Sequence, residues 1–597
     1  MRRVLTLSLI ILFLLNIFAA QNSVSAASSP MISTWEVDNR SFLNNERVIS
    51  KSSFKISAIY PSNIINAQGA GFPGYRGPGQ LVIYKQNFGR TTGTNEFGKE
   101  AVVENGKIVK LTGANSLIPK NGYVISGHGS AKKWITTNLK IGTNIIIDEE
   151  NNIITAYTTP ESFRFSAKEK IKEAEDFLDN AKKIQENPGE KKAKYYLKRA
   201  KQDLRKSNRA NDNMAVNYAK SSIEMSKIAI NYSLPYIENE LKGTWIRPTE
   251  KNQAEVRKTL DSMKSIGINT IFLETYFHGY TIFPSRTMRS YNFTEQNPIF
   301  SGFDPLKAYV TEAHARNMKV HIWFESFYVG NKHPSNDPNS ILSIRPEWGN
   351  KNKANASKEG YVSHPVEHNG YFLDPANPEI HNFLVLIVKE IISDYDVDGV
   401  NLDYIRYPSS QKATSAGYEA SNWGYTAYAR EEFKKLYGID PVNIKYGKDA
   451  MWYKWNEYRQ NKITVYLSKM HKAAKNKVML STVVFPDYKT ALETKQQNWI
   501  RWTNSDYLDA ITPLILTSDD ALFEIMLKEI KTKMSSSVNI YPGLFVGFME
   551  GEAEDLLKQI NVSRSLKSNG VILFDWAHLD NKYRDALKFC VFTSTCK

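Results

Sequence analysis

The sequence has very little cysteine: Cys590 and Cys596 are the two cysteines among 597 residues, and both stand near the C-terminal end. So few cysteines exclude a disulfide framework and a cysteine-based metal site, so the fold must rest on its hydrophobic core. Because an exported protein can hold a disulfide, we predict that these two residues pair and close a short loop in a tail at 590–597. The alternative is two free thiols.

Motifs for several kinds of chemistry are also missing. No HExxH sequence occurs, and the histidines are scattered without ligand spacing, so no metal site is predicted. No G-x-S-x-G turn indicates a serine nucleophile, and no glycine-rich phosphate loop follows the first strand expected in the C-terminal part. We therefore expect no cofactor.

Long apolar runs are confined to the N-terminus. Arg2 and Arg3 precede an apolar stretch at 4–20, and small residues at 24–26 suit cleavage after about Ala26. Residues 1–26 are thus predicted to be a signal peptide. An uncleaved anchor is the alternative, which the short run and the polar residues after it disfavour. No later segment could span a membrane, so we expect a secreted or cell-wall-associated protein.

Negative charge is in deficit, and the formal net charge is +15. A basic exported protein suits an anionic cell wall or surface. Nucleic acid is the usual rival partner for a basic chain, but here the excess is spread along the sequence and export argues against it. No nucleic-acid partner is therefore predicted.

The chain is too long for one ordinary core, and its pattern changes along its length. Short apolar runs between glycine, proline and asparagine turns predict a β-rich domain at 31–160. Apolar residues at helical spacing among lysine and glutamate predict a helical spacer at 163–238. We expect the charged residues of the spacer to form a solvated face.

From residue 241 onward, strand and helix patterns alternate and predict a (β/α)8 barrel of the TIM type over 241–589. An open doubly wound sheet is the alternative. The expected strands are 243–247, 269–276, 319–327, 398–406, 478–486, 508–516, 539–546 and 570–576. The expected helices include 254–266, 305–316, 378–394, 452–474, 519–534 and 552–566.

The fourth predicted strand carries the leading catalytic candidate, Asp403. Because alternate strand residues face opposite ways, Val400 and Leu402 should pack under the helices while Asn401 and Asp403 face the barrel axis. Active sites of such barrels lie at the carboxyl ends of the strands, where a carboxylate is costly unless it is paired, hydrated or useful. The alternative for Asp403 is a structural role.

The third predicted strand follows the same logic. His321, Trp323 and Glu325 share one face, and Glu325 should end the strand at the same mouth as Asp403. Glycosidic hydrolysis uses two carboxyl groups that flank one bond, and these two residues could supply the pair. The alternative for Glu325 is a partner that tunes Asp403 or binds a sugar hydroxyl.

Further acids and rings surround the expected mouth. Glu274 ends the second strand, Asp487 follows the fifth and Asp575 ends the eighth, so each is a candidate general acid, with Asp487 preferred as a catalytic residue. Flat sugar faces stack on aromatic rings, and polar groups beside the rings bind hydroxyls. The predicted substrate-binding residues are Arg406, Tyr404, Asn401, Trp323, His321, Tyr276, His278, Asp575 and Trp576.

Four segments together resemble the glycosyl-hydrolase-like family 10 proteins, bacterial (β/α)8 barrels distantly akin to the α-amylase superfamily. They are Gly243–Pro248, Gly279–Ser285, Trp323–Glu325 and Asp398–Pro408, and the resemblance covers about 241–580. It implies glycoside hydrolysis, and some members are associated with peptidoglycan glycan strands. By analogy with amylase-like barrels, Asp403 would be the nucleophile. Strand five departs from the analogy, since it offers Asp487 where such a barrel has a glutamate.

The N-terminal part carries a looser resemblance. Asn87–Asn95 and Ile125–Ala131 look like parts of phosphodiester-glycosidase domains. The sequence as a whole predicts an exported glycoside hydrolase acting on a cell-wall glycan, such as peptidoglycan, or on an extracellular polysaccharide. The alternatives are a non-catalytic cell-wall glycan-binding protein and a phosphodiester glycosidase acting through the N-terminal domain.

Overall fold

A computed structural model describes residues 47–61, 63–64, 79–94, 97–113, 115–184, 189–359, 370–410, 422–445, 450–549 and 553–594. The predicted signal peptide at 1–26, Cys596 and the side chain of Cys590 lie outside these described residues, so export and the disulfide stay predictions. Among the described residues, no helix has both the length and the apolar character needed to cross a membrane.

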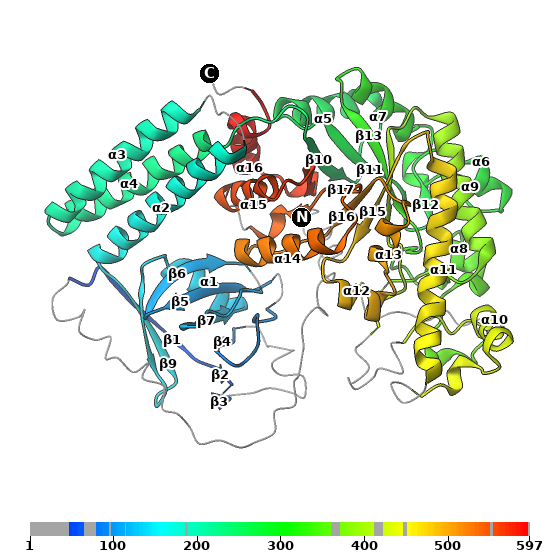
Figure 1. Cartoon of the computed structure of the whole chain (residues 1–597), viewed down its shortest axis with the longest axis horizontal. Coiled ribbons are helices and arrows are strands. Elements are labelled where there is room, and N and C mark those ends of the chain that lie inside the picture. Colours follow the sequence, from blue (N-terminus) through cyan, green and yellow to red (C-terminus); the bar gives the residue numbers. More distant parts are fainter. Residues whose placement is uncertain are drawn as a thin grey trace.

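The N-terminal part is a mostly antiparallel sheet, drawn in blue in Figure 1. The strand order is β1-β9-β8-β6-β5-β7-β4-β2-β3, and helix α1 packs its buried Trp134 and Ile135 against one face of the sheet. The elements are β1 (Ser50–Lys55), β2 (Ala58–Tyr60), β3 (Asn63–Ile64), β4 (Leu81–Lys85), β5 (Lys99–Glu104), β6 (Lys107–Thr112), β7 (Gly122–Gly127), α1 (Gly129–Asn138), β8 (Asn144–Asp148) and β9 (Ile153–Thr158).

Three long helices follow, α2 (Pro160–Ile184), α3 (Glu190–Arg209) and α4 (Asp212–Ser233). They lie side by side above the N-terminal sheet in Figure 1, and α2 contacts α15 of the C-terminal part. Their apolar residues recur at helical spacing and are buried where the helices meet, as at Ala174, Ala200 and Ala219. The lysine-rich faces are largely exposed.

The C-terminal part is a curled parallel sheet, as the strand pattern predicts. Its order is β17-β16-β15-β14-β13-β11-β10-β19-β18. Only Tyr541 and Pro542 separate β17 from β18, so the segment 539–545 pairs with β16 on one side and with β19 on the other. The strands are β10 (Leu241–Ile246), β11 (Thr270–Phe277), β13 (Lys319–Glu325), β14 (Gly399–Asp403), β15 (Met479–Val484), β16 (Ala510–Pro513), β17 (Asn539–Ile540), β18 (Gly543–Phe545) and β19 (Gly570–Phe574), with β12 (Tyr280–Thr281) beside β11.

Helices between these strands cover the outside of the sheet (Figure 1). Several begin at a side-chain cap that accepts a backbone N–H, for example Asp304 before α7 and Asn377 before α9. The helices are α5 (Gln253–Ser265), α6 (Arg286–Ser290), α7 (Pro305–His314), α8 (Ile341–Ile344), α9 (Pro378–Asp394), α10 (Ala427–Tyr437), α11 (Ala450–Ala474), α12 (Tyr488–Lys495), α13 (Trp499–Asn504), α14 (Asp520–Lys533), α15 (Ala553–Ser565) and α16 (Asn581–Ala586).

The strand residues divide between two cores, as their alternation predicts. Val400 and Leu402 pack outward with the helices. Trp245, Phe272 and Trp323 instead pack together inside the curled sheet, with residues of β15, β16 and β19. Side chains that face the same way and stand at the carboxyl ends of the strands therefore meet at one mouth.

Candidate active site

Asp403 is the last residue of β14, and its carboxyl is almost fully buried. One oxygen accepts the Trp323 indole N–H at 3.0 Å, and the other accepts the Tyr404 backbone N–H at 2.6 Å. Burial raises the pKa of the Asp403 carboxyl to about 6, although both N–H donors favour the charged form. The group is therefore charged for the most part at neutral pH.

Glu325 ends the neighbouring strand β13 and is the direct register partner of Asp403. It is 2% exposed, and its Oε2 accepts the backbone N–H of His278 at 2.9 Å. Burial raises the pKa of the Glu325 carboxyl well above its usual range, and the nearby charge of Glu274 raises it further. The two predicted catalytic carboxyls thus lie together in surroundings that favour opposite protonation states.

Glu274, on β11, brings a third carboxyl and a partner that the sequence prediction did not include. Arg247 donates from both Nε and Nη2 to its carboxylate, with the Nη2–Oε1 distance at 2.7 Å. Glu274 is fully buried and also hydrogen-bonded to Glu325. Arg247 follows β10 two residues after the inward-facing Trp245, so strand alternation could have placed it at the mouth.

Asp575 reaches the mouth from the end of β19. It is 3% exposed, and its Oδ1 lies 2.6 Å from Nδ1 of His578. This contact raises the pKa of the His578 imidazole. The negative charge of Asp575 also raises the pKa of the Arg247 guanidinium and of the Glu274 carboxyl. The next residue, Trp576, is half-buried, and the Arg584 guanidinium lies 4.2 Å from its ring centre.

Aromatic rings line the same end of the sheet. The Trp323 ring lies 5.6 Å from the Arg247 guanidinium, and its indole N–H donates to Asp403. Trp323 therefore lies between the Arg247–Glu274 pair and Asp403. Tyr404 has a positive φ of 48° and stacks on Tyr328 at 4.6 Å. Arg406 is 1% exposed, and its guanidinium packs 5.0 Å from the centre of the Tyr404 ring.

His278 stands beside Glu325 at the mouth. Its backbone adopts a positive φ of 51°, which directs its N–H to Glu325, and its ring packs edge-on against Tyr328. Burial lowers the pKa of the imidazole to about 4, and the charge of Arg247 lowers it further. The ring is therefore neutral at pH 7 and available as a hydrogen-bond donor or acceptor.

Asp487 does not join this group, which differs from the prediction that it is a catalytic acid. It precedes α12, and its Oδ1 accepts the Thr490 backbone N–H at 2.8 Å. The residue is thus the N-cap of a helix, a position for which aspartate is favoured. An aspartate that follows a strand can cap the next helix as readily as it can point into the mouth.

Three predicted substrate-binding residues are enclosed in the structure. Asn401 faces inward as expected, but its amide is fully buried and bonded to Trp245 and Ser481. His321 lies against Gly399 at the start of β14, where burial lowers the pKa of its imidazole to about 4. Tyr276 stacks on the outward-facing Phe324, because a register shift after Glu274 reverses its direction. Asn401 and His321 are thus enclosed within the sheet, while the buried Tyr276 hydroxyl has its pKa raised by burial and further by the charge of Glu325.

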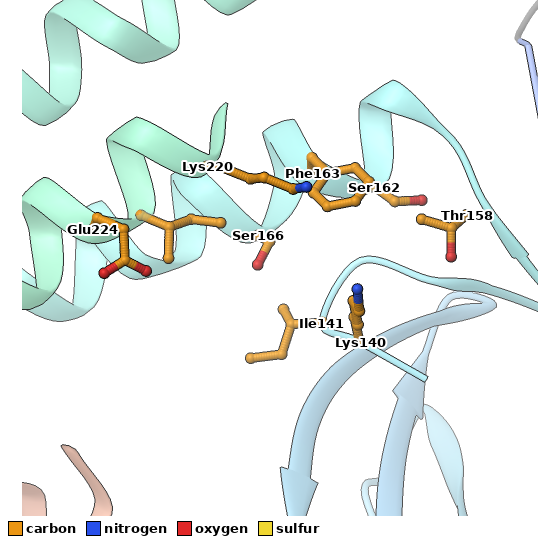
Figure 2. Close-up of a pocket in the computed structure, with 9 residues that line it drawn as sticks. Lys140, Ile141, Thr158, Ser162, Phe163, Ser166, Lys220 and Glu224 are labelled. Atoms are coloured by element: carbon orange, nitrogen blue, oxygen red, sulfur yellow. The ribbon is translucent and has the colours of Figure 1, made fainter. Parts of the chain in front are cut away.

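A cavity of about 130 Å³ lies elsewhere, between the turn at Lys140 and helices α2 and α4. Figure 2 shows Lys140 and Lys220 directed toward the Phe163 ring at this place. Glu224 is the one carboxyl among the residues that line this cavity. Within the described ranges, no three histidine, cysteine, aspartate or glutamate side chains are arranged to hold a metal ion.

Comparison with known protein families gives a match to Glycosyl hydrolase-like 10 over residues 236–559, which is more than half of the chain. The matched range contains Asp403, Glu325, Glu274 and Arg247, while Asp575 lies beyond its end. The sequence-based resemblance is therefore confirmed for the C-terminal part.

Curated relatives carry glycosyl hydrolase names. Glycosyl hydrolase DigH of Escherichia coli K12 is 34% identical over 175 residues, which cover 28% of this chain and 36% of that protein. Glycosyl hydrolase YngK of Bacillus subtilis is 24% identical over 282 residues, which cover 44% of this chain and 49% of that protein. The chain thus spans less than half the length of either relative.

Solved structures with a similar course of the chain are distant. The catalytic domain of a β-amylase from Paenibacillus polymyxa has a TM-score of 0.39 at 14% identity and covers 60% of this chain and 99% of that one. A Flavobacterium johnsoniae chitobiase has a TM-score of 0.37 at 12% identity and covers 60% of this chain and 48% of that one. Likenesses this remote carry no argument about substrate or mechanism.

Proposed function

Because the chain belongs to the glycosyl hydrolase-like 10 family, we propose that it is an exported glycoside hydrolase that cleaves O-glycosidic bonds in a cell-wall glycan. Peptidoglycan glycan strands are the substrate that we favour, and another extracellular polysaccharide is the alternative. The family match and the names of the relatives support the glycosidase class. Export and the substrate rest on the N-terminal sequence and on the net charge of +15, which suits an anionic wall.

One observation carries the proposal: Glu325 and Asp403 are register partners at the carboxyl ends of adjacent parallel strands. The cyclic pairing through 539–545 supports a full (β/α)8 barrel, in which this edge is the catalytic face. Most glycoside hydrolases use two carboxyl groups that flank the scissile bond.

The surroundings assign a role to each carboxyl. Asp403 accepts two N–H donors, which favour its charged form, so it acts as the nucleophile. Glu325 lies beside Glu274 in a buried site, which favours its protonated form, so it acts as the general acid. Environments that separate two carboxyls in this way mark the acid and the base of a glycosidase.

The reaction then has two balanced steps. Asp403 attacks the anomeric carbon while Glu325 gives its proton to the departing glycosidic oxygen. This leaves a glycosyl ester on Asp403 and a carboxylate at Glu325. Glu325 next removes a proton from water as the water oxygen attacks the same carbon, which releases the sugar and restores both residues. Adjacent strands lie about 4.8 Å apart, closer to the ~5 Å carboxyl spacing of retaining enzymes than to the wider inverting spacing.

Glu274 and Arg247 act through Glu325 and are positioning residues. Burial raises the pKa of the Glu274 carboxyl, and the charge and hydrogen bonds of Arg247 oppose that rise. The charge of Glu274 favours the protonated form of Glu325, and Arg247 holds Glu274 in place. Trp323, His278 and Tyr404 surround the reacting groups and would contact the sugar. Arg406 is buried against the Tyr404 ring and would orient it.

Digestion of purified glycan strands, followed by detection of new reducing ends, tests the proposal. Wild type should release reducing ends, whereas Asp403→Asn and Glu325→Gln should lower kcat by about 10²–10⁴-fold. Asp487→Asn is the matched control, because it makes the same charge change while keeping a helix-capping side chain. Undiminished activity of Asp403→Asn would contradict the assignment, and strand binding without reducing ends would indicate a non-catalytic glycan receptor.

A further inference from the structure

The N-terminal sheet contacts the loop that leaves β16, on the mouth side of the curled sheet. Leu514 and Leu516 of this loop pack with the interior core. The next residues turn toward the N-terminal part, where Ser518 accepts the Gly113 backbone N–H at 2.8 Å and Asp519 accepts the Leu117 backbone N–H at 3.3 Å. The N-terminal sheet therefore meets the barrel beside its carboxyl-terminal face.

The separation along this loop is short. Ser518 follows Leu516 by two residues, which span at most about 7 Å. Asp519 then caps α14 by accepting the Leu522 backbone N–H, and a helix that follows a barrel strand starts on the mouth side. The end of the N-terminal sheet thus lies about one side chain's reach from residues that line the interior.

Buried charges hold this contact in place. Lys110 of β6 lies 3.3 Å from Asp519 and 3.8 Å from Asp520, and the Asp519 side chain is 3% exposed. Arg90 approaches Glu529 of α14 at 3.7 Å. Separating Lys110 from the enclosed Asp519 would leave that carboxylate poorly solvated, whereas the exposed Arg90–Glu529 pair adds little. The sheet is therefore held against this loop.

The end of the sheet that meets the barrel has a distinctive chemistry, and we define it as the rim edge, residues 91–94, 97–99 and 115–117. Its two loops hold each other: Asn115 accepts the Gly93 N–H at 3.0 Å, and Thr92 donates its backbone N–H to Ser116. Beneath them the fully buried Glu100 accepts from the Thr92 hydroxyl and the Ser116 backbone N–H. These hydroxyls and Glu100 are buried and bonded to one another, so they hold the two loops in place, while Thr91 and Asn115 stay partly exposed.

An exposed ring stands at the same end. Phe97 is 48% exposed and precedes Lys99, the first residue of β5. Because β5 and β6 are antiparallel, the start of β5 lies beside the end of β6, where Gly113 contacts Ser518. An exposed ring can cover an apolar sugar face, and the partly exposed side chains of Thr91 and Asn115 on the same rim edge can meet sugar hydroxyls.

We propose that the rim edge is a second wall of the glycan cleft and binds sugar units remote from the bond that is cleaved. The inference rests on the proposed function for its choice of partner. It also gives a role to the segments Asn87–Asn95 and Ile125–Ala131, since Thr94 and Ser126 share a buried hydroxyl contact of 2.8 Å that supports the rim edge. Binding energy from remote sugar units raises the rate only for chains long enough to reach them.

The test compares glycan strands fractionated by length, using the full chain. Phe97→Ala should lower kcat/KM about tenfold on long strands and leave the shortest cleaved strand at the wild-type rate. Asn115→Gly should act in the same direction, because glycine keeps the positive φ of 51° but loses the contact with Gly93. Tyr195→Ala, on the exposed face of α3, is the matched control and should change nothing.

Two outcomes would overturn the inference. Phe97→Ala could leave kcat/KM unchanged at every length, or it could lower kcat/KM equally at every length. If wild type cleaves no strand, the proposed function fails, and retardation of the full chain in gels that contain the polysaccharide still tests the rim edge. Phe97→Ala must then weaken the retardation relative to Tyr195→Ala, and equal retardation would contradict the inference.

Discussion

Asp403 and Glu325 are neighbours on adjacent strands, yet single contacts give them different chemistry. Two N–H groups point at Asp403, whereas Glu325 shares its buried site with another carboxyl. Since the interior is poorly solvated, such local differences move the pKa of a carboxyl far more than they would at the surface. The residue scale therefore determines which group holds the proton.

The pH dependence of kcat/KM follows from these assignments and should be bell-shaped. Asp403 must be charged, and the pKa of its carboxyl is raised to about 6, so activity should fall as pH decreases through about 6. Glu325 must be protonated, so activity should fall again as pH rises through its raised pKa. Because the two carboxyls interact, the apparent pKa values of the two limbs belong to the pair and not to either residue alone. Activity that keeps rising from pH 5 to 9 would contradict the assignment.

Substitutions at Glu274 and Arg247 should move the basic limb in opposite directions. Glu274→Gln removes a negative charge beside Glu325 and lowers the pKa of that carboxyl, so the limb moves to lower pH. Arg247→Gln removes a positive charge and raises the pKa of Glu325, so the limb moves to higher pH. Profiles of kcat/KM against pH measure both shifts. A purely structural role would lower the rate and leave the limb in place.

At the scale of elements, a polar residue near the end of a strand can either point into the mouth or cap the helix that follows. Asp403 ends the parallel strand β14 and Asp487 follows the parallel strand β15, but Asp403 lies beside Glu325 while Asp487 caps α12. A bulge likewise decides the direction of Tyr276, because one extra residue reverses the alternation of a strand. The direction of a side chain near a strand end thus depends on the local turn.

Asp487→Ala should lower stability and preserve catalysis. Loss of the cap on α12 should reduce the free energy of unfolding by about 1 kcal/mol, and kcat should stay within about twofold of wild type. Asp487→Ser, which keeps a capping oxygen, should recover most of the stability. Urea unfolding and reducing-end assays measure the two effects. A loss of kcat comparable to that of Glu325→Gln would restore Asp487 as a catalytic candidate.

Strand periodicity was enough to find Glu325 and Asp403, because residues two apart on a strand share a face. The same rule also placed Asn401 and His321 inward. It does not say how far along the strand a side chain lies from the mouth, and both of these side chains are enclosed within the sheet. Pairings across the sheet, such as Arg247 with Glu274, depend on which strands become neighbours. No local pattern encodes that choice.

At the scale of the whole molecule, a partly buried charge network joins the three parts of the chain. Lys558 of α15 lies 3.1 Å from Glu173 of α2 and 3.7 Å from Asp520 of α14. Lys110 of the N-terminal sheet reaches Asp520 as well. Lys558 also pairs with Asp555 of its own helix, and Glu173 pairs with Lys170 of its own helix. The network therefore combines ion pairs within the parts with ion pairs that link them.

Lys558→Met should destabilise the protein more at pH 8 than at pH 5. At pH 8 the variant leaves buried carboxylates without their cation, a loss of about 3–5 kcal/mol. Burial raises the pKa of Asp555 to about 6, so below that pH the folded protein takes up a proton there and the loss shrinks. Urea unfolding at the two pH values measures the difference. Lys454→Met, whose partner Glu457 is exposed, is the control and should change stability little at either pH.

The sequence by itself predicted the strand and helix periods, a barrel of parallel strands, and Asp403 and Glu325 as leading candidates, because these follow from spacing along the chain. The family followed from the resemblance of its motifs. Only the tertiary structure decided that Asp487 caps a helix, that Arg247 pairs with Glu274, and that the N-terminal sheet lies beside the mouth. Those outcomes depend on contacts between residues far apart in the chain. Such contacts are set by the packing of whole elements, which no short stretch of sequence records.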